Sequence, residues 1–255
     1  MPLNLIDLAL VGFAALAAGV VNALAGGGTL FTFPMLTAIG VPAVAANITN
    51  SVALCPGYLG GTFAQAKDLV GQRRRALLLV PMGVMGGLVG GWLLVHTGEN
   101  VFRALVPWLI FMASGLLAAQ DPLRRWLARR AEARGHAGIR ESWAIGPIFL
   151  AAVYGGYFGA GLGVIMLATL ALTLDDTLPR LNALKQLLSL VINLACASYF
   201  VLSGHVVWPA AIVMAIAALA GGLLGGKLAG RIPPRALRRA VVAIGFALGV
   251  VYLAR

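Results

Sequence analysis

Long stretches without Asp, Glu, Lys or Arg dominate the pattern of this chain. Most of them are long enough for the ~20 apolar residues that a membrane-spanning helix needs. They cover residues 8–66, 76–98, 104–120, 142–174, 186–226 and 240–254. The chain is 60% hydrophobic and 11% charged, whereas a soluble domain is about 25% charged. The sequence therefore predicts an all-α, polytopic helical membrane protein.

Glycines, prolines and short polar turns divide these stretches into two sets of helical segments. Each set has two short pieces around a glycine-rich break, followed by three longer helices. The expected segments are 8–24, 28–39, 43–64, 76–95 and 104–119, then 143–160, 162–174, 178–202, 208–228 and 236–253. We therefore expect a first repeat over 1–119, a basic linker over 120–142 and a second repeat over 143–255.

A shift of 135 residues superposes the two sets. Under this shift Gly26 falls on Gly161, Gly28 on Gly163 and Asn47 on Asn182. A Gly-Gly-x-x-Gly-Gly pattern also recurs, as Gly86, Gly87, Gly90 and Gly91 and again as Gly221, Gly222, Gly225 and Gly226. So many coincidences at one offset indicate an internal repeat. We expect the recurring pattern to let helices pack closely.

The net charge of +11 is concentrated in the segments 67–75, 120–141 and 227–239. Basic loops beside apolar runs mark the cytoplasmic face. This distribution argues against a nucleic-acid partner and favours the lipid bilayer, with anionic lipid beside the loops. Within the linker, residues 121–133 have the pattern of an amphipathic interfacial helix that carries Trp126.

Equivalent loops of the two repeats carry opposite charge signals. Loop 67–75 is strongly basic, but its equivalent, 202–210, has no Lys or Arg. Loop 96–103 has a single Arg, but its equivalent, 231–238, has three. The sequence therefore predicts two inverted-topology repeats with the N-terminus outside. Secondary transporters often have this architecture, with a site near the bilayer midplane.

Each repeat is expected to contain a re-entrant hairpin. The segment 8–66 has to begin outside and end inside, yet the piece 28–39 is too short to cross a ~30 Å hydrocarbon core. We infer that 8–39 and 143–174 dip into the membrane and return, and that 43–64 and 178–202 then cross. Three tilted crossings per repeat keep the same parity and stay open as an alternative.

The glycine-rich breaks are the first candidate binding site. A half-helix that begins near Gly28 offers unpaired N–H groups and a partial positive charge, which bind anions. Glycine also lets a ligand approach the backbone. The candidates are Gly26, Gly27, Gly28 and Thr29 in the first repeat and Gly161 and Gly163 in the second. The alternative is that these glycines serve helix packing.

A cluster of small polar residues follows the first break. Asn47, Asn50 and Ser51 share one helix face by their spacing, and Thr49 lies beside them. Buried amides need hydrogen-bond partners. These side chains either bind substrate oxygens or tie the hairpin to its neighbour, and the sequence favours neither.

The equivalent face of the second repeat carries Asn182, Lys185 and Gln186, with Ser189 and Asn193 further along. An intramembrane lysine is costly and marks a functional hypothesis. Lys185 can balance an anionic substrate or, after losing its proton, serve proton coupling. The alternative is that its side chain reaches the membrane interface from near the start of the helix.

The chain shows no paired carboxylates, nucleophile elbow or phosphate-binding loop, so we do not expect an enzyme or a cofactor. Cys55 and Cys196 lie in apolar runs as small core residues, and no Cys/His spacing resembles a metal site. The first apolar run lacks the basic flank of a signal peptide.

Two motifs resemble a known family. Residues 18–34, Ala-Gly-Val-Val-Asn-Ala-Leu-Ala-Gly-Gly-Gly-Thr-Leu-Phe-Thr-Phe-Pro, and 47–51, Asn-Ile-Thr-Asn-Ser, resemble the first half of the TauE/SafE sulfite-exporter permeases. Residues 154–163, with Asn182 to Lys185, resemble the second half. The second copy departs from the first, because Thr169 stands where Pro34 does. The resemblance implies a bacterial inner-membrane transporter of sulfite or small organosulfonates with inverted repeats and ion coupling.

Together these features predict a secondary transporter that moves a small anion by alternating access, coupled to a proton or a sodium ion. An uncoupled anion channel and a membrane accessory or scaffold protein are the alternatives. The sequence does not indicate an oligomeric state or the direction of transport.

Overall fold

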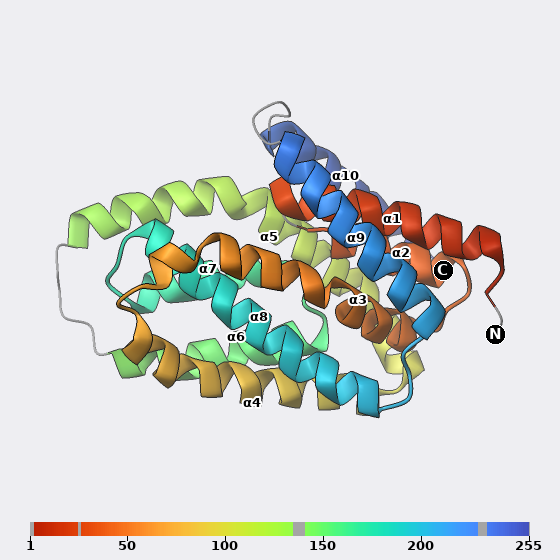
Figure 1. The fold of residues 1–255 in the computed structure, drawn as a ribbon, viewed down its shortest axis with the longest axis horizontal. Coiled ribbons are helices and arrows are strands. Elements are labelled where there is room, and N and C mark those ends of the chain that lie inside the picture. The colour runs from red at the N-terminus through yellow and green to blue at the C-terminus, as the bar shows by residue number, and fades with distance from the viewer. Residues whose placement is uncertain (1–2, 25–26, 135–140, 229–233, 255) are drawn as a thin grey trace.

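The computed structural model describes residues 3–24, 27–134, 141–228 and 234–254 (Figure 1). Within these ranges the chain is helical and contains no β-strand. The α-helices are α1 (Leu5–Leu24), α2 (Thr29–Ala38), α3 (Ala43–Ala64), α4 (Arg73–Thr97), α5 (Glu99–Arg134), α6 (Ile145–Tyr157), α7 (Leu162–Thr173), α8 (Leu178–Leu202), α9 (Trp208–Leu228) and α10 (Pro234–Leu253). Two 3-10 turns, Ala66–Leu69 and Glu141–Ala144, connect them. The all-α prediction is confirmed.

Six of the described helices are long and apolar enough to cross a membrane: α1, α4, α5, α8, α9 and α10. This confirms the prediction of a multi-pass helical membrane protein. The short helices α2, α6 and α7 have 10, 13 and 12 residues. At ~1.5 Å per residue none of these three spans a ~30 Å core.

Helix α5 differs from the element that the sequence predicts there. We expected a span that ends at residue 119 and a separate interfacial helix, but α5 runs unbroken for 36 residues from Glu99 to Arg134. The basic residues after Asp121 continue the helix because Leu127 buries its side chain, to 2% exposure, against the rest of the protein. Residues 135–140 of the predicted linker lie outside the described residues.

Glycines allow two pairs of helices to pack closely side by side (Figure 1). A Cβ atom on Gly86 or Gly90 of α4 would lie 2.7 or 2.1 Å from the carbonyl oxygen of Phe149 or Val153 on α6. On α9, a Cβ atom on Gly221 would lie 2.0 Å from the Leu16 oxygen of α1. The packing role predicted for the recurring glycine pattern is confirmed at Gly86, Gly90 and Gly221.

These two pairs are equivalent under the shift of 135 residues, because α1 then overlays α6 and α4 overlays α9. Each repeat therefore packs its first helix against the fourth helix of the other repeat. The contacts of Gly86 and Gly90 advance along both chains together, so α4 and α6 run parallel.

Two pairs of equivalent helices, α3 with α8 and α5 with α10, run antiparallel to one another. Between α3 and α8, Thr62 contacts Gln186, and Gln65, just beyond α3, contacts Asn182, so residue numbers rise on one chain as they fall on the other. Between α5 and α10, the rings of Phe111 and Phe246 lie 5.7 Å apart, and these two residues are equivalent under the shift of 135. The side chains of Tyr58 and Asn193, also equivalent, lie next to one another.

Residues related by a two-fold axis touch where they lie on that axis, so the two contacting pairs are consistent with two repeats related in this way. Since the equivalent helices α5 and α10 are antiparallel, the arrangement also supports opposite orientations of the repeats in the membrane. That orientation, like the repeat boundaries, stays a prediction.

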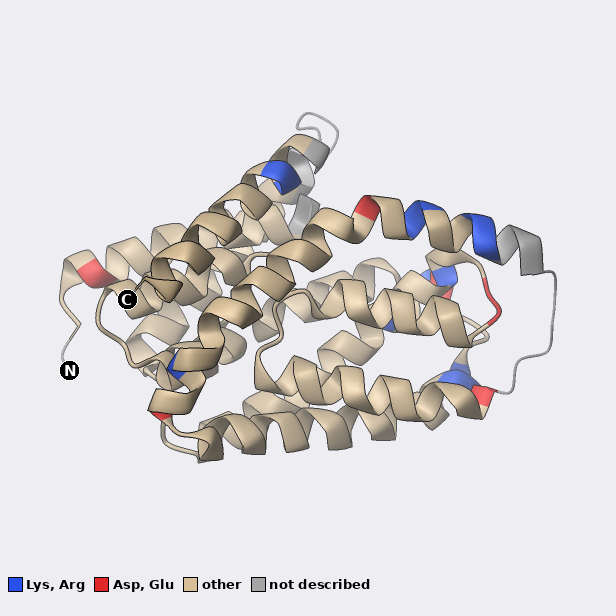
Figure 2. Cartoon of the chain, turned by 180° about the vertical axis from the view of Figure 1, so that it is seen from behind, with Lys and Arg blue, Asp and Glu red and all other residues tan. Residues whose placement is uncertain are grey.

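Charged residues gather near the ends of the bundle, with long uncharged stretches between them (Figure 2). At one end Arg75 forms ion pairs with Glu141, at 2.8 Å, and with Asp176. Glu141 precedes α6 and Asp176 follows α7, so the α6–α7 hairpin begins and ends at the same place. At the other end Glu99 accepts hydrogen bonds from the N–H groups of Ala43 and Val44 at the start of α3.

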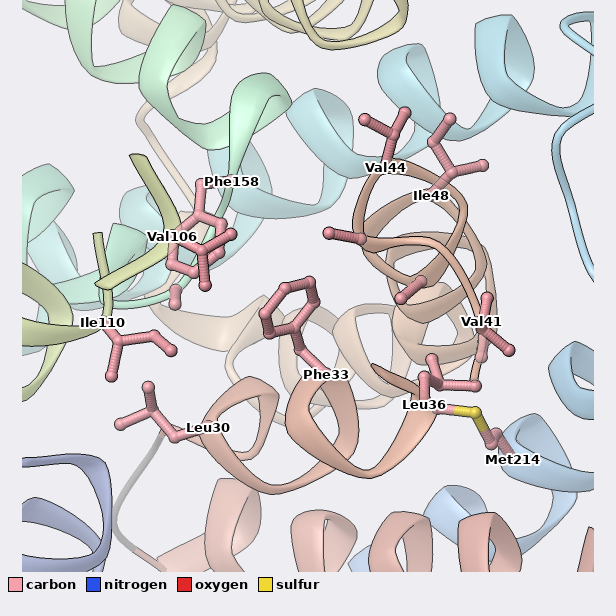
Figure 3. Close-up of a cluster of buried hydrophobic side chains, with 14 of the residues drawn as sticks. Leu30, Phe33, Leu36, Val41, Val44, Ile48, Val106, Ile110, Phe158 and Met214 are labelled. Atoms are coloured by element: carbon pink, nitrogen blue, oxygen red, sulfur yellow. The ribbon is translucent and has the colours of Figure 1, made fainter. Parts of the chain in front are cut away.

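The centre of the bundle is an apolar core around Phe33 of α2 (Figure 3). Its ring lies edge-on to Phe158, at 5.8 Å between centroids, and to Phe102, at 6.3 Å. Phe158 lies in the break between α6 and α7. The core thus joins the first hairpin to the second break and fixes their relative position.

Candidate functional site

The first break lies between α1 and α2. Gly27 has a φ angle of 93°, which residues with a side chain rarely adopt, and Gly28 precedes α2. The N–H of Gly28 donates to Oδ1 of Asn22 at 2.8 Å. One of the N–H groups that the sequence offered to an anion is therefore already bound by the protein. Gly26 lies outside the described residues.

The glycines of the first break are also closely packed. A Cβ atom on Gly28 would lie 2.7 Å from the carbonyl oxygen of Ala18, and one on Gly27 would lie 2.5 Å from Cδ1 of Leu117 on α5. Thr29 begins α2 and is partly buried. These contacts support the packing alternative for Gly27 and Gly28.

The polar face of α3 is used to join elements. Nδ2 of Asn47 donates to the carbonyl oxygen of Tyr157 at 2.8 Å, at the end of α6. Oδ1 of Asn50 accepts a hydrogen bond from Thr32 on α2, and Ser51 donates to the Asn47 carbonyl at 2.9 Å. The geometry thus favours the tying role over the substrate-binding role for Asn47 and Asn50.

The second break lies between α6 and α7. Gly159 and Gly161 have φ angles of 76° and 78°, and the hydroxyl of Tyr154 donates to the Ala160 carbonyl. At the start of α7 the N–H groups of Leu162 and Val164 bond to backbone oxygens. Within the described residues the N–H of Gly163 donates to none, so this half-helix keeps an open donor.

Lys185 of α8 lies against this half-helix. A Cβ atom on Gly163 would lie 3.9 Å from Cδ and 4.0 Å from Nζ of Lys185, and the space there holds no other atom within 4 Å. Among the described side chains no hydrogen bond or ion pair holds the ammonium group, and the charge that acts on it there is the positive charge of Arg124. The region around the second break is therefore positive, because it combines Lys185, Arg124 and the N-terminus of α7.

The position of Lys185 argues against the interface-reaching alternative. Helix α7 ends at Thr173, two residues before the surface pair Asp175 and Asp176, and Gly163 lies ten residues further into the bundle. That is about 15 Å along the helix. Because the Lys185 ammonium lies beside Gly163, its side chain points toward the break.

Two predicted neighbours of Lys185 lie elsewhere. Asn182 donates to the side chain of Gln65, just beyond the end of α3, and the amide of Gln186 lies 2.5 Å from the position of a Cβ atom on Gly61 of α3. The structure therefore brings Lys185, Gly161 and Gly163 together and leaves Asn182 and Gln186 at the α3 contact. Further along α8, Ser189 and Asn193 are buried.

Both breaks lie against the same part of α5. Leu117 contacts Gly27, and Ala113 and Leu116 contact Gly161. Sequence reasoning did not assign this role to α5, nor the bracing roles to Asn22 and Tyr154. Asn22 was the available signal, since a polar residue within an otherwise apolar helix needs a partner.

The sequence matches the model of one family of membrane proteins. The family model of the sulfite exporter TauE/SafE covers residues 11–252 of this chain. The chain belongs to the TauE/SafE family. The expected resemblance is thereby confirmed over nearly the whole length, including both breaks, α3 and α8.

Relatives of this TauE/SafE chain are named as transporters. It is 25% identical to a "Probable membrane transporter protein" of Haemophilus influenzae, over 93% of this chain and 90% of the relative. It is 26% identical to "Probable membrane transporter protein YfcA" of Escherichia coli K12, over 84% and 77%, and 22% identical to "Probable membrane transporter protein ORF9" of a Sinorhizobium species, over 97% and 92%. No solved structure matches the chain significantly. The family and these relatives indicate a membrane transporter.

Proposed function

We propose that this protein is a secondary transporter that carries a small oxyanion, sulfite or an organosulfonate, across the bacterial inner membrane. The observation that carries the proposal is the Lys185 ammonium beside the N-terminus of α7, without a carboxylate partner among the described residues. A buried cation is costly unless it is paired. An anionic substrate supplies the missing partner.

The chemistry of the second break suits a sulfur oxyanion. Such an anion carries several acceptor oxygens around a compact centre. The Lys185 ammonium offers up to three donors, and the N–H of Gly163 offers another at the positive end of a helix. The absence of a side chain at Gly163 lets the anion approach the backbone. We assign binding to Lys185 and Gly163, with Gly161 setting the turn of the chain.

Alternating access completes the proposal. The antiparallel α3–α8 and α5–α10 pairs give two like-built units that can rock against one another about a fixed site. The α6–α7 hairpin moves with the second unit. Arg75 of the first unit holds the two ends of this hairpin through ion pairs with Glu141 and Asp176. We propose that this ion-pair cluster closes one face in the conformation described, and that a proton or sodium gradient drives the cycle.

Proteoliposomes test the function. Purified protein is reconstituted, and uptake of radiolabelled sulfite and of a short organosulfonate is followed with an imposed proton or sodium gradient. A coupled transporter accumulates the anion above equilibrium, and collapse of the gradient with an ionophore abolishes the accumulation. Equilibration without accumulation would instead identify an uncoupled channel. No uptake of any tested oxyanion by folded protein would leave an accessory or scaffold role.

A further inference from the structure

The distal part of α5 has a face that the transport mechanism does not use. Beyond Asp121 the helix buries Leu127 and partly buries Leu123, one turn apart, against the protein. The opposite face exposes Arg125, Trp126 and Arg129. Figure 2 shows the basic positions following one another along this part of the helix. The segment is thus docked by one side and presents a basic, aromatic side outward.

This outward face is hollowed. Pro122, Arg125, Trp126 and Arg129 line a depression of about 300 Å³. The guanidinium of Arg130 lies 5.2 Å from the centre of the Trp126 ring, which holds the indole in place by a cation–π interaction. The depression therefore has two arginines at its rim and a fixed aromatic plane in its wall.

The two arginines repel one another unless an anion lies between them. Arg125 and Arg129 are one turn apart, where like charges destabilise a helix. Neither forms an ion pair with a carboxylate among the described side chains. The base of the segment, in contrast, is fixed, because Arg238 of α10 pairs with Asp121. Two guanidinium groups without a carboxylate partner among the described side chains are a ready site for phosphate oxygens.

The site lies where a lipid headgroup would be. A 36-residue helix is about 54 Å long and exceeds a ~30 Å core, so its charged distal part lies at the membrane surface. Glu141 follows Arg134 by seven positions and pairs with Arg75, which keeps the end of α5 within about 25 Å of the basic 67–75 loop. Exposed tryptophan is typical of the headgroup level, and anionic lipids enrich the cytoplasmic leaflet.

We infer that the depression lined by Pro122, Arg125, Trp126 and Arg129 binds the headgroup of an anionic phospholipid. Arg125 and Arg129 hold the phosphate from both sides, and the first methylenes of the acyl chains lie along Pro122 and the Trp126 ring. The bound lipid fixes the orientation of the α5 extension at the membrane surface. This inference does not depend on which anion the protein transports.

Quenching of tryptophan fluorescence by brominated lipid tests the site. The full-length protein is placed in nanodiscs of phosphatidylcholine with 30 mol% of either dibrominated phosphatidylglycerol or dibrominated phosphatidylcholine. The signal of Trp126 is the difference between the parent protein and the Trp126→Phe variant. We expect stronger quenching of Trp126 by the anionic lipid than by the zwitterionic lipid.

Charge variants assign that preference to the depression. The double variant R125Q/R129Q should reduce the apparent affinity for phosphatidylglycerol roughly tenfold or more, since each surface arginine contributes about fivefold. The matched control is R73Q/R74Q, which removes the same charge from the same end of the molecule and should keep the preference. Circular dichroism and gel filtration establish that both variants are folded.

Four results would overturn the inference. Equal quenching by the two lipids would show that the depression does not select charge. An unchanged preference in R125Q/R129Q would place the lipid elsewhere. An equal loss in both double variants would mean a diffuse attraction to the basic surface rather than a site. Displacement of the brominated lipid by soluble RNA or an acidic peptide, but not by unlabelled phosphatidylglycerol, would assign the depression to those partners.

Discussion

The two broken hairpins are built to one plan but differ in what they leave unpaired. In the first, the side chain of Asn22 accepts a hydrogen bond from the N–H of Gly28, and the hydroxyl of Thr32 donates one to Asn50. In the second, neither the N–H of Gly163 nor the ammonium of Lys185 has a partner among the described residues. The comparison teaches that two repeats can share the same helical arrangement while only one of them carries a binding site. The first break holds the fold, and the second is the place where an anion would be bound.

Replacing Lys185 has the largest expected effect. Lys185→Met keeps the length of the side chain but removes its charge, so anion affinity should fall roughly ten- to a hundredfold, the worth of a charge-assisted hydrogen bond. Binding is measured by titrating sulfite and organosulfonates into purified protein. Lys185→Arg retains the charge and should bind more tightly than Lys185→Met.

The matched variant at the equivalent position of the first repeat is Asn50→Met. It should leave anion affinity within about twofold and lower the melting temperature instead, because Thr32 loses its hydrogen bond to Asn50 and keeps only the longer one, 3.3 Å, to the Gly28 carbonyl. If Asn50→Met and Lys185→Met weaken binding equally, the two breaks share the anion and the contrast between them is lost.

A pair of glycine variants sharpens the contrast further. Gly163 has helical backbone and open space, so Gly163→Leu should fold and reduce transport about tenfold by filling that space. Gly28→Ala forces a methyl group to within 2.7 Å of the Ala18 oxygen, and overpacking of this kind costs about 1–3 kcal/mol. Thermal unfolding and uptake are measured on both variants. If the Gly28→Ala protein is stable but inactive, the first break takes part in anion binding.

The amide of Asn47 is expected to stabilise the contact between the repeats. Asn47→Leu removes the donor to the Tyr157 carbonyl and leaves a partly buried acceptor unpaired, which costs about 1–3 kcal/mol. Unfolding in detergent should shift accordingly, whereas anion affinity in the remaining folded protein should hold. The tying role is wrong if Asn47→Leu is as stable as the parent but fails to bind substrate.

The smallest effect concerns acid at the cluster that joins the second hairpin to α4. Burial alone would raise the pKa of the Asp176 carboxyl, but hydrogen bonds from Arg180, the Thr177 N–H and Arg75 outweigh it and lower the pKa below its ordinary value of 3.8. A depressed carboxyl pKa stabilises the folded state above the unfolded value and ceases to do so as pH falls through the folded value.

Thermal unfolding between pH 7 and pH 3 measures this contribution. The parent protein should lose stability below about pH 4, and Asp176→Asn should lose less because its contribution is already absent at pH 7. The same acid sensitivity in the variant as in the parent would remove Asp176 from the account.

Much of the frame could be predicted from the sequence. The uncharged runs predicted the candidate spans α4, α5, α8, α9 and α10, and the glycine run at 26–28 predicted the first break. Helix α1, predicted to be part of a re-entrant hairpin, is long and apolar enough to cross, and α3, predicted to cross, is not among the candidate spans of the described residues. The helix over 121–133 was predicted, but as a separate interfacial helix within a basic linker; its continuity with the preceding span in α5 was missed, because the burial of Leu127 that continues the helix depends on the tertiary structure. Charge patterning separates loops from spans, but it does not distinguish a loop from a helix that leaves the membrane.

The site was only partly predictable, for a reason of side-chain direction. Asn182, Lys185 and Gln186 share a helix face by spacing, yet their long side chains diverge toward α3 and α7. Likewise, the partner of Asn47 is a carbonyl 110 positions away in the sequence. Spacing within one helix says which residues lie together on its surface, but not which other helices their side chains contact.

The exchange of helices between the halves has a consequence for synthesis on the ribosome. Gly12 of α1 contacts Val213 of α9, so α1 waits for a partner made about 200 residues later. At 5–20 residues per second that interval is roughly 10–40 s. During this time lipid or the insertion machinery must keep the early helices from binding other proteins. The nascent protein reaches its final packing only when translation is almost complete.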